Sequence, residues 1–117
     1  LSYAAMVAGW AETRGGPLPR RLLAFHLGNG ASACAILGGR SVASTMGYSP
    51  LAGLTMGTRT GDIDGNAVLK LAAAHGIDGA ARILNRDSGL KGLGGASDMR
   101  ALRAAGTPEA ALSLIHI

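Results

Sequence analysis

Residues 21–45 read RLLAFHLGNGASACAILGGRSVAST, and this stretch decides the fold. Three mostly apolar runs of strand length occupy residues 21–28, 31–37 and 40–45. Gly38 and Gly39 have the composition of a two-residue hairpin turn, and Gly28-Asn29-Gly30 between the first two runs consists of residues that are typical of turns. The stretch therefore predicts a three-stranded antiparallel meander.

The residues before the meander predict a helix that ends near Glu12. Tyr3, Met6, Val7 and Trp10 recur at helical spacing, so they form one apolar face that we expect to lie in the core. A break rich in glycine and proline follows. After the meander, residues 46–63 have no sustained period and contain four glycines and a proline. A loop of this length is usually functional.

The remainder of the chain predicts helices, which makes the fold class α/β, with antiparallel strands at 21–45 followed by helices. Asp64 is a good N-cap, and Gly76 suits the end of the first helix. The expected elements are a helix at 65–75, a helix at 78–87, a glycine-rich turn at 92–95, a helix capped by Ser97 and ended by Gly106, and a helix opened by Thr107-Pro108.

Composition narrows the function classes. The chain has 117 residues, 48% hydrophobic and 15% charged, which favours a packed core over disorder. The net charge of +4 comes mainly from arginines, which suit phosphate and carboxylate groups. Because the arginines are dispersed and aromatic residues are few, nucleic acid is not an expected partner. No apolar run approaches the ~18 residues of a membrane span, so no membrane partner is expected.

Cysteine and histidine give no sign of a metal centre. Cys34 is the single cysteine, so no disulfide can form within the chain, and no Cys/His group has zinc spacing. We expect Cys34 to be a buried structural thiol. His75 near a helix end and His116 near the C-terminus are given no catalytic role.

The first motif with chemistry is the His26–Ser32 segment. Gly28 and Gly30 would let backbone N–H groups approach an anion, Asn29 offers side-chain donors, and His26 could donate to a phosphate oxygen. The same residues also fit a plain hairpin with Asn-Gly at its turn. Both interpretations stay open from these residues alone.

The second motif is the loop around Arg59, which lies between Gly57 and Gly61. A guanidinium there could offset the charge that builds on a transferring phosphoryl group. The alternative is a surface arginine paired with Asp62 or Asp64. The i, i+2 spacing of these aspartates does not make their side chains converge, and Asp64 is better explained as a helix cap than as a metal ligand.

Taken together, the two motifs carry a resemblance to a known family. Residues 26–64 strongly resemble the acetate kinase (acetokinase) family, whose pattern reads HLGNG-S and then G-S-V-x-T-S-M-G-x-T-P-L-x-G-L-x-M-G-T-R-S-G-D-x-D-P. Looser resemblance reaches Leu1-Ser2-Tyr3 on one side and residues 87–100 on the other. Nearly all of residues 1–111 can be placed. Three residues depart from the pattern: Gly65 stands for a proline, Met99 for an aromatic residue and Tyr3 for a frequent second histidine.

The resemblance implies a function and a fold. Members transfer the ATP γ-phosphoryl group reversibly to acetate, giving acetyl phosphate and ADP with Mg²⁺, on the fold of actin, sugar kinases and heat-shock chaperone ATPases. It implies a catalytic role for Arg59 and nucleotide-phosphate binding by His26, Gly28, Asn29 and Gly30. The expected partners are acetate or another short carboxylic acid and a nucleotide, in a cytoplasmic homodimer at full length. Propionate or butyrate kinase remains an alternative, as does a non-catalytic phosphate-binding module.

The resemblance also implies a division of the chain. Residues 1–20 would be the end of a helix and a linker, and 21–111 the start of the second, C-terminal domain. Residues 112–117, LSLIHI, lose the polar side of a surface helix and resemble a translated sequencing adaptor, so we expect a non-native tail; a buried apolar helix end is the alternative. An internal fragment of this kind should lack the Mg²⁺ ligands, be inactive alone, and be poorly soluble because its strands would expose apolar faces.

Overall fold

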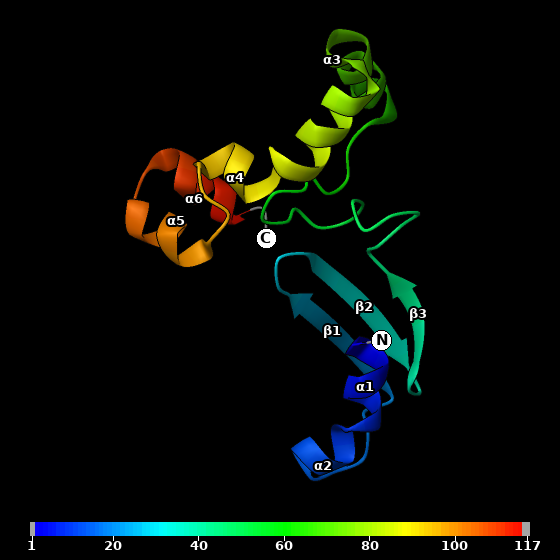
Figure 1. Ribbon diagram of the computed structural model, residues 1–117. Coiled ribbons are helices and arrows are strands. Elements are labelled where there is room, and N and C mark those ends of the chain that lie inside the picture. The colour runs from blue at the N-terminus through cyan, green and yellow to red at the C-terminus, as the bar shows by residue number, and fades with distance from the viewer. Residues whose placement is uncertain (1, 116–117) are drawn as a thin grey trace.

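The computed structural model describes residues 2–115, and its centre is a three-stranded antiparallel sheet (Figure 1). The strands are β1 (Arg21–Leu27), β2 (Ala31–Leu37) and β3 (Arg40–Ser44), hydrogen-bonded in the order β1-β2-β3. The predicted meander is confirmed, although β1 and β3 each end one residue earlier than expected. A bulge between Ala35 and Ile36, which the sequence did not reveal, shifts the register of β2 against β3.

The turn between β2 and β3 has the predicted chemistry. Gly38 and Gly39 have φ angles of 54° and 80°. Two consecutive positive φ values define the turn whose twist matches a right-handed strand pair, and glycine adopts them without a Cβ penalty. The two-residue hairpin is therefore confirmed.

Two short helices, α1 (Ser2–Ala8) and α2 (Trp10–Arg14), replace the single N-terminal helix that we predicted. Gly9 separates them, and glycine is a poor helix former. Tyr3, Met6 and Val7 pack on the buried Ala24, Cys34 and Ile36 of the sheet, as expected. Trp10 was wrongly assigned to this face, because it lies in α2, where its ring is 5.9 Å from the Arg14 guanidinium carbon.

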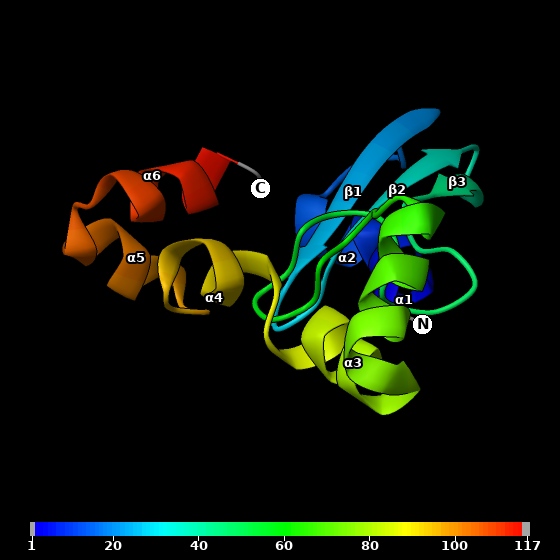
Figure 2. The same cartoon turned by 90° about the horizontal axis from the view of Figure 1, so that it is seen from above.

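The opposite face of the sheet is open. Leu23, Phe25 and Val42 are 61%, 57% and 62% exposed, and a shallow apolar hollow of about 520 Å³ lies over Leu23, Ala35 and Val42. The radius of gyration is 16.9 Å, whereas a compact chain of this length has about 13 Å. Figure 2 shows why: the sheet and the last three helices stand apart, and a long loop and one further helix lie between them in the chain. Poor solubility of the isolated chain stays a prediction.

Four helices follow the loop at residues 45–64: α3 (Gly65–Arg86), α4 (Gly89–Gly94), α5 (Met99–Ala105) and α6 (Pro108–Ile115). Asp64 caps α3 as predicted, since its carboxylate accepts from the Asn66 N–H at 2.7 Å. The two helices expected on either side of Gly76 are confirmed as halves of α3, because Gly76 interrupts it with φ 71° and ψ 170°.

Two expectations in the last third of the chain are wrong. The glycine-rich turn expected at 92–95 is wrong, because residues 89–94 form α4 and Gly95 caps its end. Leu90 packs with Leu102 and Ala110 in a small core that outweighs the low helix propensity of glycine. The cap of α5 is Asp98 and not Ser97, because the Asp98 carboxylate accepts from two backbone N–H groups. The expected end at Gly106 (φ 63°) is confirmed.

The C-terminal residues continue α6 as far as Ile115. Ser113 is fully buried and donates to the Leu90 carbonyl at 3.1 Å. Residues 1, 116 and 117 lie outside the described residues, and with them His116, so the non-native origin of residues 112–117 stays a prediction. Within the described part of the chain, no helix is both long and apolar enough to span a membrane.

Candidate phosphate-binding site

The Arg59 loop is closed at its base by a pair of hydrogen bonds between Gly53 and Asp62. The Gly53 N–H donates to the Asp62 carboxylate at 2.7 Å, and the Asp62 N–H donates to the Gly53 carbonyl at 2.9 Å. Gly53 (φ 96°) packs so tightly on the carbonyl of Thr45 that no side chain would fit there. The two ends of the loop are thus held together where β3 ends.

The helices hold the tip of the same loop from the other side. The N–H groups of Ser88 and Leu90 donate to the carbonyls of Thr58 (3.1 Å) and Met56 (2.9 Å). Gly89 between them has a φ of 65°, and a Cβ there would collide with the Met56 carbonyl. Backbone hydrogen bonds thus fix the segment that carries Arg59, although it has no regular secondary structure.

The Arg59 side chain lies back across the loop. Its Nη1 donates to the Pro50 carbonyl at 3.1 Å and lies 3.7 Å from the thioether of the buried Met56. Among residues 2–115 the ion pairs are Arg82–Asp87, Lys91–Asp87 and Arg100–Asp98, so the alternative in which Arg59 pairs with Asp62 or Asp64 is wrong. Arg59 therefore retains a positive charge that no carboxylate of the described residues neutralises.

The turn between β1 and β2 meets this guanidinium. The Gly28 N–H donates to the Gly30 carbonyl at 2.9 Å, which tightens the turn. A Cβ placed on Gly30 would lie 3.2 Å from Nη1 of Arg59, and one on Gly28 would lie 3.5 Å from Nε2 of His26. The fold thus brings together His26, Gly28, Gly30 and Arg59, with the exposed Asn29 at the tip of the turn.

Sequence reasoning missed three contributors to this site. The Pro50 carbonyl and the Met56 thioether contact Arg59, and Ser97 lies against Gly57, with its Cβ 3.4 Å from the position of a Cβ there. Ser97 and Met99 also line a cavity of about 80 Å³ beside Asn29. The only feature of the sequence that pointed to Ser97 was the similarity of residues 97–100 to a later family segment. This similarity does not reveal that Ser97 lies beside the turn between β1 and β2.

Tyr3 connects the N-terminal helix to the strand behind the turn. Its hydroxyl donates to the Ser32 carbonyl at 2.9 Å and lies 2.7 Å from Ser32 Oγ. Ser32 is directly opposite His26 in the sheet. Tyr3, which stands where the family often has a histidine, thus has a structural role next to the site.

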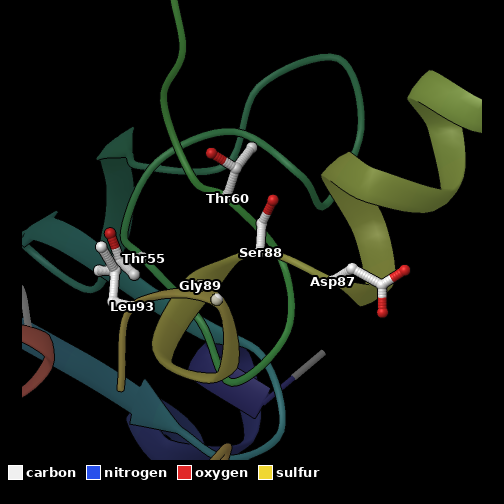
Figure 3. A pocket seen from close by; sticks show the side chains of 7 residues that line it. Thr55, Thr60, Asp87, Ser88, Gly89 and Leu93 are labelled. Carbon is white, nitrogen blue, oxygen red and sulfur yellow. The ribbon is translucent and has the colours of Figure 1, made fainter. Parts of the chain in front are cut away.

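A larger cavity of about 380 Å³ lies where the loop meets the start of α4 (Figure 3). The hydroxyl-bearing residues Thr55, Thr60 and Ser88 line it, and its single charged residue, Asp87, points away from Thr60 and Ser88. A hydrogen bond from Lys91 lowers the pKa of Asp87 below its usual value, and Arg82 adds to this effect. Asp87 is thus held in surface ion pairs, so we assign this cavity no chemistry.

Acidic residues near Arg59 do not form a magnesium site. Asp62 is bonded to Gly53 and Asp64 caps α3. No cluster of three or more histidine, cysteine or acidic residues occurs within residues 2–115. The residues present therefore do not fit a protein-bound Mg²⁺ ion.

Comparison with known proteins identifies the family. The sequence model of the acetokinase family matches residues 12–114. The acetate kinase of Corynebacterium jeikeium is 55% identical over 83 residues, covering 69% of this chain and 21% of the relative. That of Clavibacter michiganensis is 49% identical over 113 residues, covering 92% and 28%. The chain belongs to the acetokinase family, and it spans about a quarter of the length of these relatives.

Solved structures agree with this assignment. Acetate kinase from Porphyromonas gingivalis superimposes with a TM-score of 0.84 at 34% identity, covering 95% of this chain and 30% of that one. A propionate kinase from Francisella tularensis gives 0.85 at 32% identity, covering 98% and 31%. The expected α/β fold of the actin-like type, with its antiparallel strands followed by helices, is confirmed.

Proposed function

We propose that this chain is the phosphate-handling part of an acetate kinase, which transfers the ATP γ-phosphoryl group reversibly to acetate and gives acetyl phosphate and ADP. The observation that carries the proposal is the approach of the Arg59 guanidinium to Gly30, at 3.2 Å from the position of a Cβ. Arg59 and the glycine turn come together although Gly30 and Arg59 are 29 residues apart in the sequence. An anion-binding site explains this contact better than a plain hairpin does.

Each residue has a role that follows from its chemistry. Arg59 would stabilise the charge that develops on the equatorial oxygens of the transferring phosphoryl group, because its own charge is not neutralised by a carboxylate. Gly28 and Gly30 keep the turn free of side chains, so that phosphate oxygens can approach its backbone closely. Asn29 and His26 are exposed and would donate to nucleotide phosphates.

Other parts of the enzyme would complete the site. The relatives are several times longer than this chain, so we expect the Mg²⁺ ligands and much of the acyl pocket in the regions that it does not match. We therefore expect the chain to be inactive alone, and to work in the cytoplasm as a homodimer when these regions are present.

The acyl substrate is the least constrained part of the proposal. The likeness to a propionate kinase keeps propionate as a second candidate, and butyrate is a third. A non-catalytic phosphate-binding module would also use the glycine turn. It would not need a guanidinium fixed beside that turn, so kinase activity is the better explanation.

The test is a chimera in which residues 12–114 replace the matching segment of the Clavibacter michiganensis acetate kinase. Acyl phosphate formation from ATP is measured as the hydroxamate, with acetate, propionate and butyrate. We expect turnover to be highest with acetate and to fall by about a thousandfold or more in Arg59→Ala, in line with the worth of arginine in other phosphoryl transfers.

The matched control is Arg103→Ala, since Arg103 is an exposed arginine in the last turn of α5, outside the site. It should keep full turnover. Near-normal turnover of Arg59→Ala would show that Arg59 is a surface residue without a catalytic role. A folded chimera that phosphorylates none of the three acids would favour the non-catalytic binding module.

A further inference from the structure

Two hydrogen-bonded connections join residues 50–53 to residues 59–62 in the Arg59 loop. One is the bond from Arg59 Nη1 to the Pro50 carbonyl at 3.1 Å. The other is the reciprocal pair between Asp62 and Gly53, at 2.7 and 2.9 Å. The Asp62–Gly53 connection lies three residues further along both segments than the Arg59–Pro50 connection. The Asp62 connection therefore sets how far the Pro50 carbonyl lies from the backbone of Arg59.

The two segments are otherwise supported unequally. Residues 56–60 are bonded to the ends of α3 and α4, for example through the Thr60 N–H and the Leu84 carbonyl at 3.0 Å. Residues 47–50 are exposed, and the Tyr48 side chain is fully exposed. Because only residues 56–60 are anchored to the helices, the position of the other segment depends on the end of β3, on which Gly53 packs, and on its connections to residues 59–62.

We propose that Asp62 is a positioning residue for phosphoryl transfer: by holding Gly53 it keeps the Pro50 carbonyl where it orients the Arg59 guanidinium. This inference rests on the proposed function and adds a residue to it. Among residues 2–115 no hydrogen bond or ion pair joins Asp62 to Arg59, so Asp62 would act through the geometry of the loop.

Stability alone does not explain the choice of a carboxylate at position 62. The bond to Gly53 is exposed to solvent, so after its loss water would satisfy the Gly53 N–H, and the fold would lose little. Misplacing a catalytic group by about 1 Å costs on the order of 100-fold in rate. Asp62 should therefore matter far more for turnover than for folding.

Asp64 is the matched control. It is also an exposed aspartate whose carboxylate accepts from a backbone N–H at 2.7 Å, but its partner is Asn66 at the start of α3. Asp62→Ala and Asp64→Ala each remove one carboxylate bond, at positions two residues apart. Only the first weakens a connection within the Arg59 loop, because it leaves the Asp62 N–H bond to the Gly53 carbonyl as the remaining half. Asp62→Asn keeps an acceptor oxygen and serves as the conservative variant.

The experiment measures kcat and KM of the chimera with these substitutions, alone and combined with Arg59→Ala. We expect Asp62→Ala to lower kcat by about 100-fold with little change in KM for acetate. Asp62→Asn should recover most of this loss, and Asp64→Ala should stay within about twofold, as expected for a surface change outside the loop. The double variant should be no slower than Arg59→Ala, because Asp62 acts only through Arg59.

Three results would overturn the inference: equal kcat for Asp62→Ala and Asp64→Ala, a kcat of Asp62→Ala within about threefold of the chimera's, or losses that multiply in the double variant. Any of these in an active chimera leaves the proposed function intact. A folded chimera without turnover for any acid would instead overturn the proposed function, and this inference with it.

Discussion

Replacing Gly30 by alanine tests the contact between the turn and Arg59 directly. The added Cβ would lie 3.2 Å from Nη1 of Arg59 and 3.7 Å from the Met56 sulfur. The first distance is tighter than an ordinary van der Waals contact, so the guanidinium must move by a few tenths of an ångström. Gly30 is not among the glycines with positive φ, and its backbone therefore accepts alanine without strain.

The cost in turnover follows from that displacement. A misplacement of about 1 Å costs on the order of 100-fold, so a shift of a few tenths should lower kcat by roughly tenfold, or about 1.4 kcal/mol. The assay is hydroxamate formation by the chimera, and a thermal melt of the same preparation checks that the variant is folded.

Gly65→Ala is the control for this substitution, because a Cβ on Gly65 would meet nothing within 4 Å. It should leave kcat unchanged and stabilise α3 slightly, since alanine is the better helix former. A folded Gly30→Ala variant with the turnover of Gly65→Ala would refute the idea that the exact position of Arg59 matters for catalysis.

Two further predictions concern stability. Leu102→Ala should lower the free energy of unfolding by about 2–5 kcal/mol, because Leu102 is 1% exposed in the core with Leu90 and Ala110; the thermal melt of the chimera measures this, and an unchanged melting temperature would contradict it. Backbone hydrogen bonds, chiefly from the Ala101 N–H, lower the pKa of Asp98 in the folded protein. The ionised carboxylate therefore adds to the free energy of unfolding at pH values above the unfolded pKa near 3.8, and this contribution is lost as the pH falls through the lower folded pKa. Unfolding measured between pH 6 and 2 should therefore depend less on pH in Asp98→Asn than in the parent, and identical profiles would show that the Asp98 cap does not contribute.

The sequence predicted those elements whose signals are local. The meander could be predicted from residues 21–45 because its apolar runs are separated by glycine turns, and neighbouring strands pair with each other without a distant partner. The α4 helix could not, because the four glycines at 89, 92, 94 and 95 favour a turn, and only the packing of Leu90 against α5 and α6 offsets this. Predictions failed where tertiary contacts outweigh local propensity.

The candidate site shows the same limit. The residues of both motifs were identified from the sequence, and Arg59 was singled out by its bracketing glycines. Their approach to one another could not be derived, since it depends on hydrogen bonds from the ends of α3 and α4 to a loop without regular structure. The resemblance to a family supplied what local reasoning lacked.

The two aspartates near Arg59 explain how its charge stays available to an anion. Unpaired carboxylates three and five residues away could have captured the guanidinium, which was the competing interpretation of the sequence. In the structure each carboxylate accepts instead from a backbone N–H at 2.7 Å, one at Gly53 and one at Asn66. The guanidinium is oriented by the neutral Pro50 carbonyl, which does not cancel its charge. An arginine held in this way can still stabilise a developing negative charge, whereas one paired with a carboxylate would first have to break that ion pair.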